Sequence, residues 1–124
     1  MTIKELMQKS NEEPQNFTIY FGNFLDEFYN ADDSKKNIMI QDPPENYDNI
    51  KRETYAYVAA AVEKLCNDSK IQVPSWAMES KYFLEEPYFA MNAKGFLKVI
   101  LLFESPNEFL VRNIFVSENV LDRV

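Results

Sequence analysis

The segment from Tyr47 to Asn67, YDNIKRETYAYVAAAVEKLCN, decides the fold class of the chain. Its apolar residues recur at steps of three and four positions, which is the spacing of one face of an α-helix. Alanines between them let neighbouring elements approach closely. The segment is therefore predicted to be the strongest helix of the protein. Its expected buried side consists of Tyr47, Ile50, Thr54, Val58, Ala61, Val62 and Leu65, and the close-approach positions are Ala56, Ala59 and Ala60.

A second helix is predicted over residues 14–30, where aromatic side chains form one broad stripe. We interpret the stripe as core rather than as an aromatic slot for a cofactor, because aromatic residues are mostly buried in folded domains. Gly22 lies in the middle and costs roughly 1 kcal/mol relative to alanine. A close helix crossing is the expected compensation. The stripe consists of Phe17, Tyr20, Phe21, Phe24, Leu25 and Phe28.

Four short segments carry a capping residue three positions before a glutamate, which is a helix start signal. They are Thr2–Glu5, Ser10–Glu13, Asp42–Glu45 and Ser105–Glu108. We expect the last to be the strongest, because its proline falls where the first helical residue would lie. Ser117 is expected to cap a final short helix.

The sequence pattern does not decide the secondary structure of two segments. Residues 31–46 read as a connector in which 37–40 form either a helical turn or a short extended piece. Residues 96–103 form a buried strand or a buried helix, and their leucine content favours the helix. The predicted fold class is all-α, a multi-helix bundle of about five to six helices with room for one short strand pair. The length of 124 residues predicts a single domain over residues 1–124.

The composition excludes several kinds of chemistry, because the chain has no histidine, one cysteine and two glycines. These counts rule out a histidine-based triad, a His/Cys zinc site, an internal disulfide and a glycine-rich phosphate loop. We predict no catalytic residue, no metal and no cofactor, and hence not an enzyme. Cys66 is interpreted as a small buried apolar residue.

The charge balance describes an acidic protein, with 13 basic and 20 acidic residues and a net charge of −7. Such a surface repels phosphate backbones, so binding to nucleic acid is disfavoured. The longest apolar run, around residues 96–103, is too short to cross a bilayer. The first residues lack the apolar core of a signal peptide, so we expect a cytoplasmic protein without membrane contact.

Two features are candidates for contact with a partner. Aromatic residues crowd among glutamates from residue 76 to 91 without a helical period, as in recognition surfaces or in an irregular core. Arg112 and Asn113 are flanked by apolar triplets, and a buried arginine needs a carboxylate or carbonyl partner. A structural ion pair with Glu104, Glu108, Asp26 or Glu27 is one interpretation, and a partner contact is the other. The candidate partner-binding residues are Trp76, Tyr82, Tyr88, Phe89, Arg112 and Asn113.

The C-terminal half resembles a group of short, uncharacterised bacterial proteins. The residues that carry the resemblance are Pro74–Trp76, Glu86–Phe89, Glu104–Phe109 and Arg112–Ser117. It covers roughly residues 74–124 and is weaker over 47–67. Such proteins are often encoded beside a nucleotidyltransferase-like protein, an arrangement seen in toxin–antitoxin pairs. The resemblance implies an adaptor or antitoxin role and supplies no catalytic residues.

Three functional hypotheses follow. The leading one is an interaction or adaptor domain that binds another protein, such as the product of an adjacent gene, and a homodimer is a further option. The second is a sequence-specific DNA-binding regulator. The third is a carboxylate- or metal-dependent hydrolase. The second would use Arg112, Asn113, Asn119 and Arg123, and the third Glu79, Glu85 and Glu86.

Overall fold

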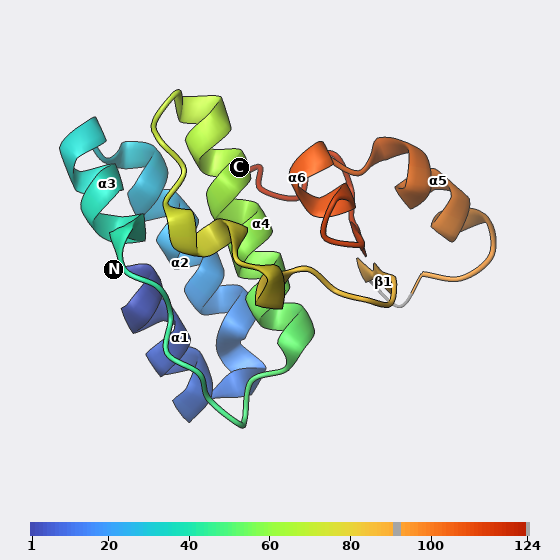
Figure 1. Cartoon of the computed structure of the whole chain (residues 1–124), viewed down its shortest axis with the longest axis horizontal. Helices are drawn as coiled ribbons and strands as arrows, with labels where there is room; N and C mark the ends of the chain where they lie inside the picture. Colours follow the sequence, from blue (N-terminus) through green and yellow to red (C-terminus); the bar gives the residue numbers. More distant parts are fainter. Residues whose placement is uncertain (91–92, 124) are drawn as a thin grey trace. The chain divides into compact units, whose positions relative to one another are not determined.

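The computed structural model describes residues 1–90 and 93–123, and the fold is mainly helical. These residues form six α-helices and one short two-stranded sheet (Figure 1). The predicted all-α fold of about five to six helices is confirmed. The chain divides into two compact units. The first unit consists of Met1–Lys51 together with Arg123, and the second unit is Arg52–Asp122. The single domain over residues 1–124 stays a prediction.

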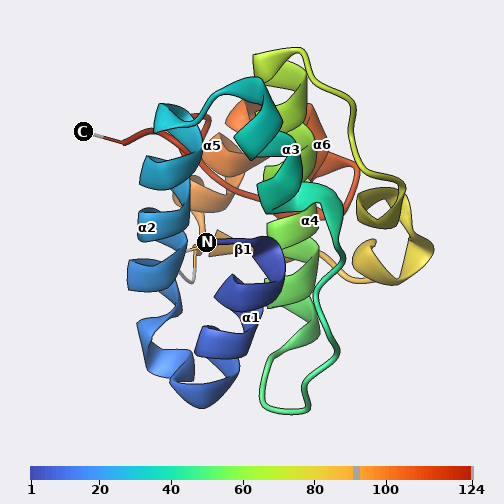
Figure 2. The same cartoon turned by 90° about the vertical axis from the view of Figure 1, so that its left-hand side faces the viewer.

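The first unit contains three α-helices. These are α1 (Ile3–Glu12), α2 (Phe17–Asn30) and α3 (Asp33–Gln41). A single 3₁₀ turn, η1 (Pro14–Asn16), joins α1 to α2, and the two helices pack against each other (Figure 2).

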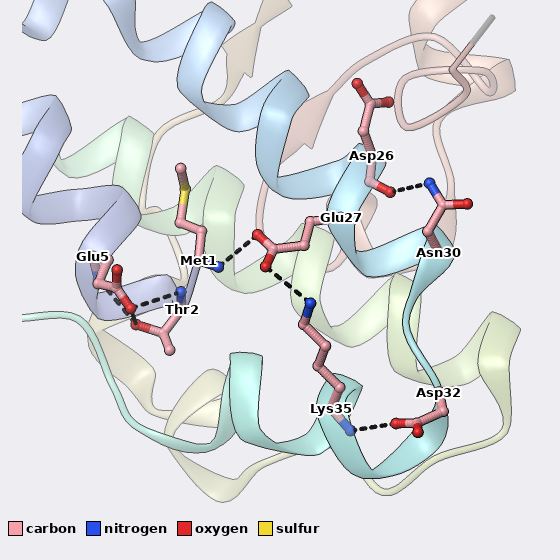
Figure 3. Close-up of polar contacts among 8 residues, drawn as sticks. All are labelled: Met1, Thr2, Glu5, Asp26, Glu27, Asn30, Asp32 and Lys35. Carbon is pink, nitrogen blue, oxygen red and sulfur yellow. Dashed lines mark hydrogen bonds and ion pairs between the residues drawn. The ribbon is translucent and has the colours of Figure 1, made fainter.

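Helix α1 begins with the predicted capping box. The Thr2 hydroxyl accepts a hydrogen bond from the Glu5 amide at 3.1 Å, and the Glu5 carboxylate accepts one from the Thr2 amide at 3.4 Å (Figure 3). The second predicted start, at Ser10, is wrong. Ser10 lies in the last turn of α1, where its hydroxyl donates to the Leu6 carbonyl at 2.8 Å, and a serine can form this bond inside a helix.

Helix α2 carries the predicted aromatic stripe. Phe21, Phe24 and Phe28 are buried, and successive rings along the helix stack at centroid distances of 6.1 to 6.3 Å. Leu25 is buried as well, so the core prediction is confirmed for four of the six stripe residues, and Phe17 and Tyr20 are half-buried. The atoms nearest to Gly22 belong to the side chain of Arg123 and not to a crossing helix. A Cβ atom at Gly22 would lie 3.0 Å from the guanidinium of Arg123, which donates to Asp26 through Nε at 2.9 Å and Nη2 at 3.2 Å.

Helix α3 settles one of the open segments. Residues 37–40 are helical, and the helix begins after Asp32, whose carboxylate accepts from the Lys35 amide at 2.8 Å. Glu27 on α2 pairs with the Lys35 ammonium at 3.2 Å and with the amino group of Met1 (Figure 3). No helix starts at Asp42, because α3 ends at Gln41 and an extended stretch with two prolines follows.

The second unit combines three α-helices with the two-stranded sheet. Strands β1 and β2 are parallel, with Tyr88 opposite Ile114 and Phe89 opposite Phe115. Parallel strands need a long crossover connection, and residues 90–113 provide it with two of the helices. The elements are α4 (Arg52–Ser69), the 3₁₀ turns η2 (Ser75–Met78) and η3 (Ser80–Tyr82), β1 (Tyr88–Phe89), α5 (Phe96–Glu104), α6 (Asn107–Leu110) and β2 (Ile114–Phe115).

Helix α4 is the predicted strongest helix, and it starts five residues later than Tyr47. A turn closes before it, in which the Ile50 amide donates to the Tyr47 carbonyl at 3.2 Å. Aspartate and asparagine fill the middle of that turn and favour it over helix. Every residue from Val58 to Val62 is buried, and so is Cys66, as predicted.

The C-terminal elements confirm one expectation and correct two. Residues 96–103 are helical, as the leucine content indicated. Ser105 does not cap α6, because its hydroxyl donates to the Leu101 carbonyl and accepts from the Val116 amide at 2.9 Å. Ser117 starts a turn rather than a helix. Within the described residues, none of the helices combines the length and apolar character that crossing a bilayer requires.

Candidate protein-binding cleft

Arg112 lies in the interior of the second unit, with its side chain fully buried. One terminal nitrogen, Nη1, donates to the Glu63 carboxylate at 2.5 Å and to the Glu108 carbonyl at 2.8 Å. The other, Nη2, donates to the Ala77 carbonyl at 2.7 Å. The guanidinium also lies 4.6 Å from the centre of the Phe83 ring. Arg112 thus ties α4, α6 and the segment after α4 together.

The carboxylate that pairs with Arg112 belongs to none of the four acids named from the sequence. Glu63 precedes Arg112 by 49 residues and sits on α4. Glu108 contributes its backbone carbonyl, while its carboxylate accepts from Asn67 at 2.9 Å. A side chain without exposed surface does not touch a partner, so Arg112 supports the fold around the candidate site.

Asn113 holds the segment that leads into β1. Its φ of 67° is a left-handed conformation that asparagine tolerates better than most residues. Its carbonyl accepts from the Tyr88 amide at 2.9 Å, and its side-chain amide points at the Leu84 and Glu85 carbonyls at 3.4 and 3.3 Å. Asn113 therefore positions residues 84–88.

The first two candidate aromatics are interior residues. Trp76 and Tyr82 are 5% and 2% exposed, and their rings meet edge to face at a centroid distance of 5.7 Å. Burial is also the main reason why the pKa of Tyr82 is raised. The turns η2 and η3 pack on α4, and this packing explains why no helical period was visible in the sequence.

Phe89 and Tyr88 follow each other in β1 and differ in exposure. Phe89 is half-buried, with its ring stacked on Phe115 at 4.6 Å and the Lys98 ammonium 4.7 Å from its centre. Tyr88 is 42% exposed. Neighbouring residues of a strand point to opposite faces, so only one of the two can join the small core.

Tyr88 lines a cleft of about 270 Å³ in the second unit. The cleft brings the start of α4 next to the segment that Asn113 holds. Burial raises the pKa of Tyr57 on α4 to about 12, and the neighbouring Tyr88 adds to this shift. The lining residues are Arg52, Glu53, Leu84, Glu85, Glu86, Pro87 and Tyr88.

The cleft combines an acidic rim with an aromatic wall. Three of its lining residues are glutamates, and Arg52 is the one lining residue with a positive charge. Glu85 and Glu86 are exposed, so a charged partner can reach them. Such a surface suits a segment that carries lysine or arginine together with an apolar or flat group that packs on the tyrosine ring.

The residues of the DNA-binding hypothesis have other contacts. Arg112 is buried, the Asn113 amide faces two carbonyls, and the Arg123 guanidinium forms a two-pronged pair with Asp26. The carboxylates of the hydrolase hypothesis separate as well, since Glu79 pairs with Lys81 at 3.6 Å and lies outside the cleft. In residues 1–90 and 93–123, no three His, Cys, Asp or Glu side chains gather as metal ligands would.

The sequence predicted one side of the cleft, because residues 84–88 lie in the candidate recognition stretch 76–91, but not the other side. Tyr88 was among the candidates, whereas Arg52 and Glu53 were not. They follow a turn more than thirty residues upstream of the rest, and a single sequence carries no signal that places them there. Glu85 and Glu86 belong to the aromatic and acidic stretch 76–91, for which a recognition surface was one interpretation, and they were also carboxylates of the hydrolase hypothesis.

Comparison of the chain with protein-family models, with curated proteins and with solved structures finds no match in any of the three.

Proposed function

We propose that this chain is an interaction domain that binds another protein at the cleft beside Tyr88. The observation that carries the proposal is the cleft itself, a cavity of about 270 Å³ with an exposed tyrosine and an acidic rim. Tyrosine is enriched at protein interfaces because it offers a large rigid surface and a polar tip at low entropic cost.

The acidic rim indicates the charge of the partner. The whole chain carries a net charge of −7, and the cleft lining adds three carboxylates against one guanidinium. Complementary charge speeds association and selects among partners. The expected partner therefore presents basic residues at its binding surface.

The resemblance of residues 74–124 adds a more specific form of the proposal. A nucleotidyltransferase-type protein has to attract phosphates, so its active site is expected to be basic. An acidic domain that covers such a site in the cytoplasm would act as an antitoxin. Three of the segments that carry the resemblance, Glu86–Phe89, Glu104–Phe109 and Arg112–Ser117, include the β1 wall of the cleft and the residues that position it.

The experiment is a calorimetric titration with the product of the adjacent gene. Tyr88→Ala should weaken binding at least about tenfold, because an exposed aromatic anchor is removed. Tyr29→Ala is the matched control, since Tyr29 is 45% exposed and lies on α2 of the other unit. Equal affinities of the two variants, or no binding by the unchanged chain, would refute the proposal.

A pair of charge variants tests the rim separately. Replacing both Glu85 and Glu86 by glutamine should weaken binding and reduce its dependence on salt concentration. The same change at the adjacent exposed acids Glu12 and Glu13 removes equal charge from the first unit and should leave the affinity unchanged. If both double variants lose affinity alike, the attraction comes from net charge and not from the cleft.

A further inference from the structure

Helix α5 is apolar but hardly buried. Only Leu101 is fully covered, and it packs into a small cluster with Ala93 and Phe115. A helix that is apolar on most of its surface normally lies inside a protein. The other large apolar side chains of α5 are exposed, with fractions of 78% for Phe96, 37% for Leu97, 44% for Val99, 38% for Ile100, 47% for Leu102 and 88% for Phe103.

Five of the six exposed side chains form one continuous face. At roughly 100° per residue, Val99, Phe103 and Phe96 all lie within about 40° of the direction opposite Leu101. Ile100 and Leu102 flank them on either side. The measured exposures agree with this geometry, since the two phenylalanines opposite Leu101 have the largest exposed fractions. We call this arc the α5 face.

The area of the α5 face reaches the range of a specific interface. With a fully exposed aromatic side chain taken at roughly 200 Å² and an aliphatic one at roughly 150 Å², the five side chains of the face expose ~500 Å² of apolar surface. Leu97 lies about 40° from Leu101 and is outside the face. This area lies in the upper half of the range for patches on monomeric proteins, roughly 300–600 Å². Two copies of this face would together bury ~1,000 Å², about the minimum area of a biological interface.

The charge of the chain favours a second copy over a charged partner as the molecule that covers the α5 face. Because each chain carries a net charge of −7, two copies repel each other over most of their surface. The α5 face itself carries no charge, and the two charged residues beside it, Lys98 and Glu104, cancel. A second copy therefore meets no like charge there, and a charged partner finds nothing to pair with.

The topology explains why such a face exists. Helix α5 belongs to the crossover between two parallel strands, and a crossover helix normally buries one side against a broad sheet. Here each strand has two residues, so the sheet covers little more than Leu101. Figure 1 shows α5 beside α6 and β1 at the end of the second unit that is remote from α4.

From these observations we propose that the α5 face is the contact surface of a homodimer, in which the α5 helices of two chains pack against each other. The contact is separate from the cleft, because no residue of α5 lines that cavity. A dimer of this kind leaves both clefts available.

Sedimentation of the full chain over a range of micromolar concentrations tests the proposal. The unchanged protein should double its mass as the concentration rises. Phe103→Glu should raise the dissociation constant at least roughly tenfold, because it places a charge in the centre of an apolar contact. Phe96→Glu should raise the dissociation constant in the same way. This second variant controls for misfolding of the Phe103→Glu protein.

Ile38→Glu is the matched control, since Ile38 is 64% exposed and lies on α3 in the first unit. It should dimerise like the unchanged protein, and circular dichroism should show equal helix content in all four proteins. A chain that stays monomeric at every concentration would overturn the proposal. So would a dimer that survives both phenylalanine variants, because the contact would then lie elsewhere.

Discussion

Helices α4 and α5 belong to the same unit and differ in how their apolar residues are used. Helix α4 contains a run of small residues, and every position from Val58 to Val62 is buried. Helix α5 has larger apolar side chains and a higher proportion of them, yet only Leu101 is fully buried. Hydrophobicity alone therefore does not determine burial. Close approach requires small side chains and a surface large enough to cover the helix.

The two helices also differ in their polar contacts. Glu63 of α4 receives the buried guanidinium of Arg112, which joins α4 to α6 and to the segment before the cleft. Helix α5 has one charged contact with another element, the Lys98 ammonium near the Phe89 ring. The first helix supports the cleft, and the second presents a surface.

Breaking the buried pair on α4 should have the largest effect. Arg112→Ala removes the partner of Glu63 and leaves the Ala77 and Glu108 carbonyls without a donor. Loss of one member of a buried ion pair costs about 3–5 kcal/mol of the free energy of unfolding. Urea unfolding followed by circular dichroism measures it. Arg123→Ala, which breaks the exposed pair with Asp26, should cost much less, and equal losses would contradict the contrast.

The thiol on α4 should make stability fall at high pH. Burial raises the pKa of Cys66 to about 11 from its ordinary value of 9.0. The unfolded chain then loses the thiol proton first, so the stabilisation is complete below pH 9.0 and is lost as the pH rises to about 11. A shift of this size corresponds to about 2–3 kcal/mol.

The measurement compares the unchanged protein with Cys66→Ala in urea at both ends of that pH range. Tyr57, whose pKa is also raised, contributes to both proteins, so the difference between them reports Cys66. An identical pH dependence in the two proteins would show that the thiol is accessible and that the α4 surface is less closed than described.

A matched pair of substitutions tests the α4 and α5 surfaces directly. Ala60→Leu adds three carbon atoms where the exposed fraction is zero, and overpacking should cost about 1–3 kcal/mol. Phe103→Gln replaces a side chain that is 88% exposed. In dilute solution, where the chain is monomeric, it should change the free energy of unfolding by less than about 0.5 kcal/mol.

Chemical unfolding of both variants at low concentration checks this pair. A large loss for Phe103→Gln would mean that α5 is covered within its own chain. A negligible loss of unfolding free energy for Ala60→Leu would mean that the packing around Ala60 leaves space for a larger side chain.

Much of the fold was predictable because its signals are local. The spacing of Phe21, Phe24 and Phe28 predicted α2, and the pair Thr2 and Glu5 predicted the start of α1. A predicted helix start was wrong where the serine hydroxyl forms a different hydrogen bond. At Ser105 the hydroxyl accepts from the Val116 amide and does not cap a helix.

The long-range contacts were not predictable from one sequence. Arg112 was recognised as needing a partner, but Glu63 lies 49 residues away, and nothing in the sequence favours it over Glu104 and Glu108, which are nearer. Gly22 makes room for Arg123, and no periodicity connects two residues a hundred positions apart. In the candidate site, Tyr88 was found because it is aromatic in an acidic context, whereas Arg52 and Glu53 reach the cleft only through the path of the chain.

Hydrogen exchange of the backbone amides tests the central claim, that a partner binds at the cleft beside Tyr88. The chain is measured alone and after addition of the protein encoded by the adjacent gene. We predict that exchange slows in residues 84–88 and at the start of α4, while the amides of α2 stay unchanged. A stable complex in which residues 84–88 exchange as fast as in the free chain would contradict the account.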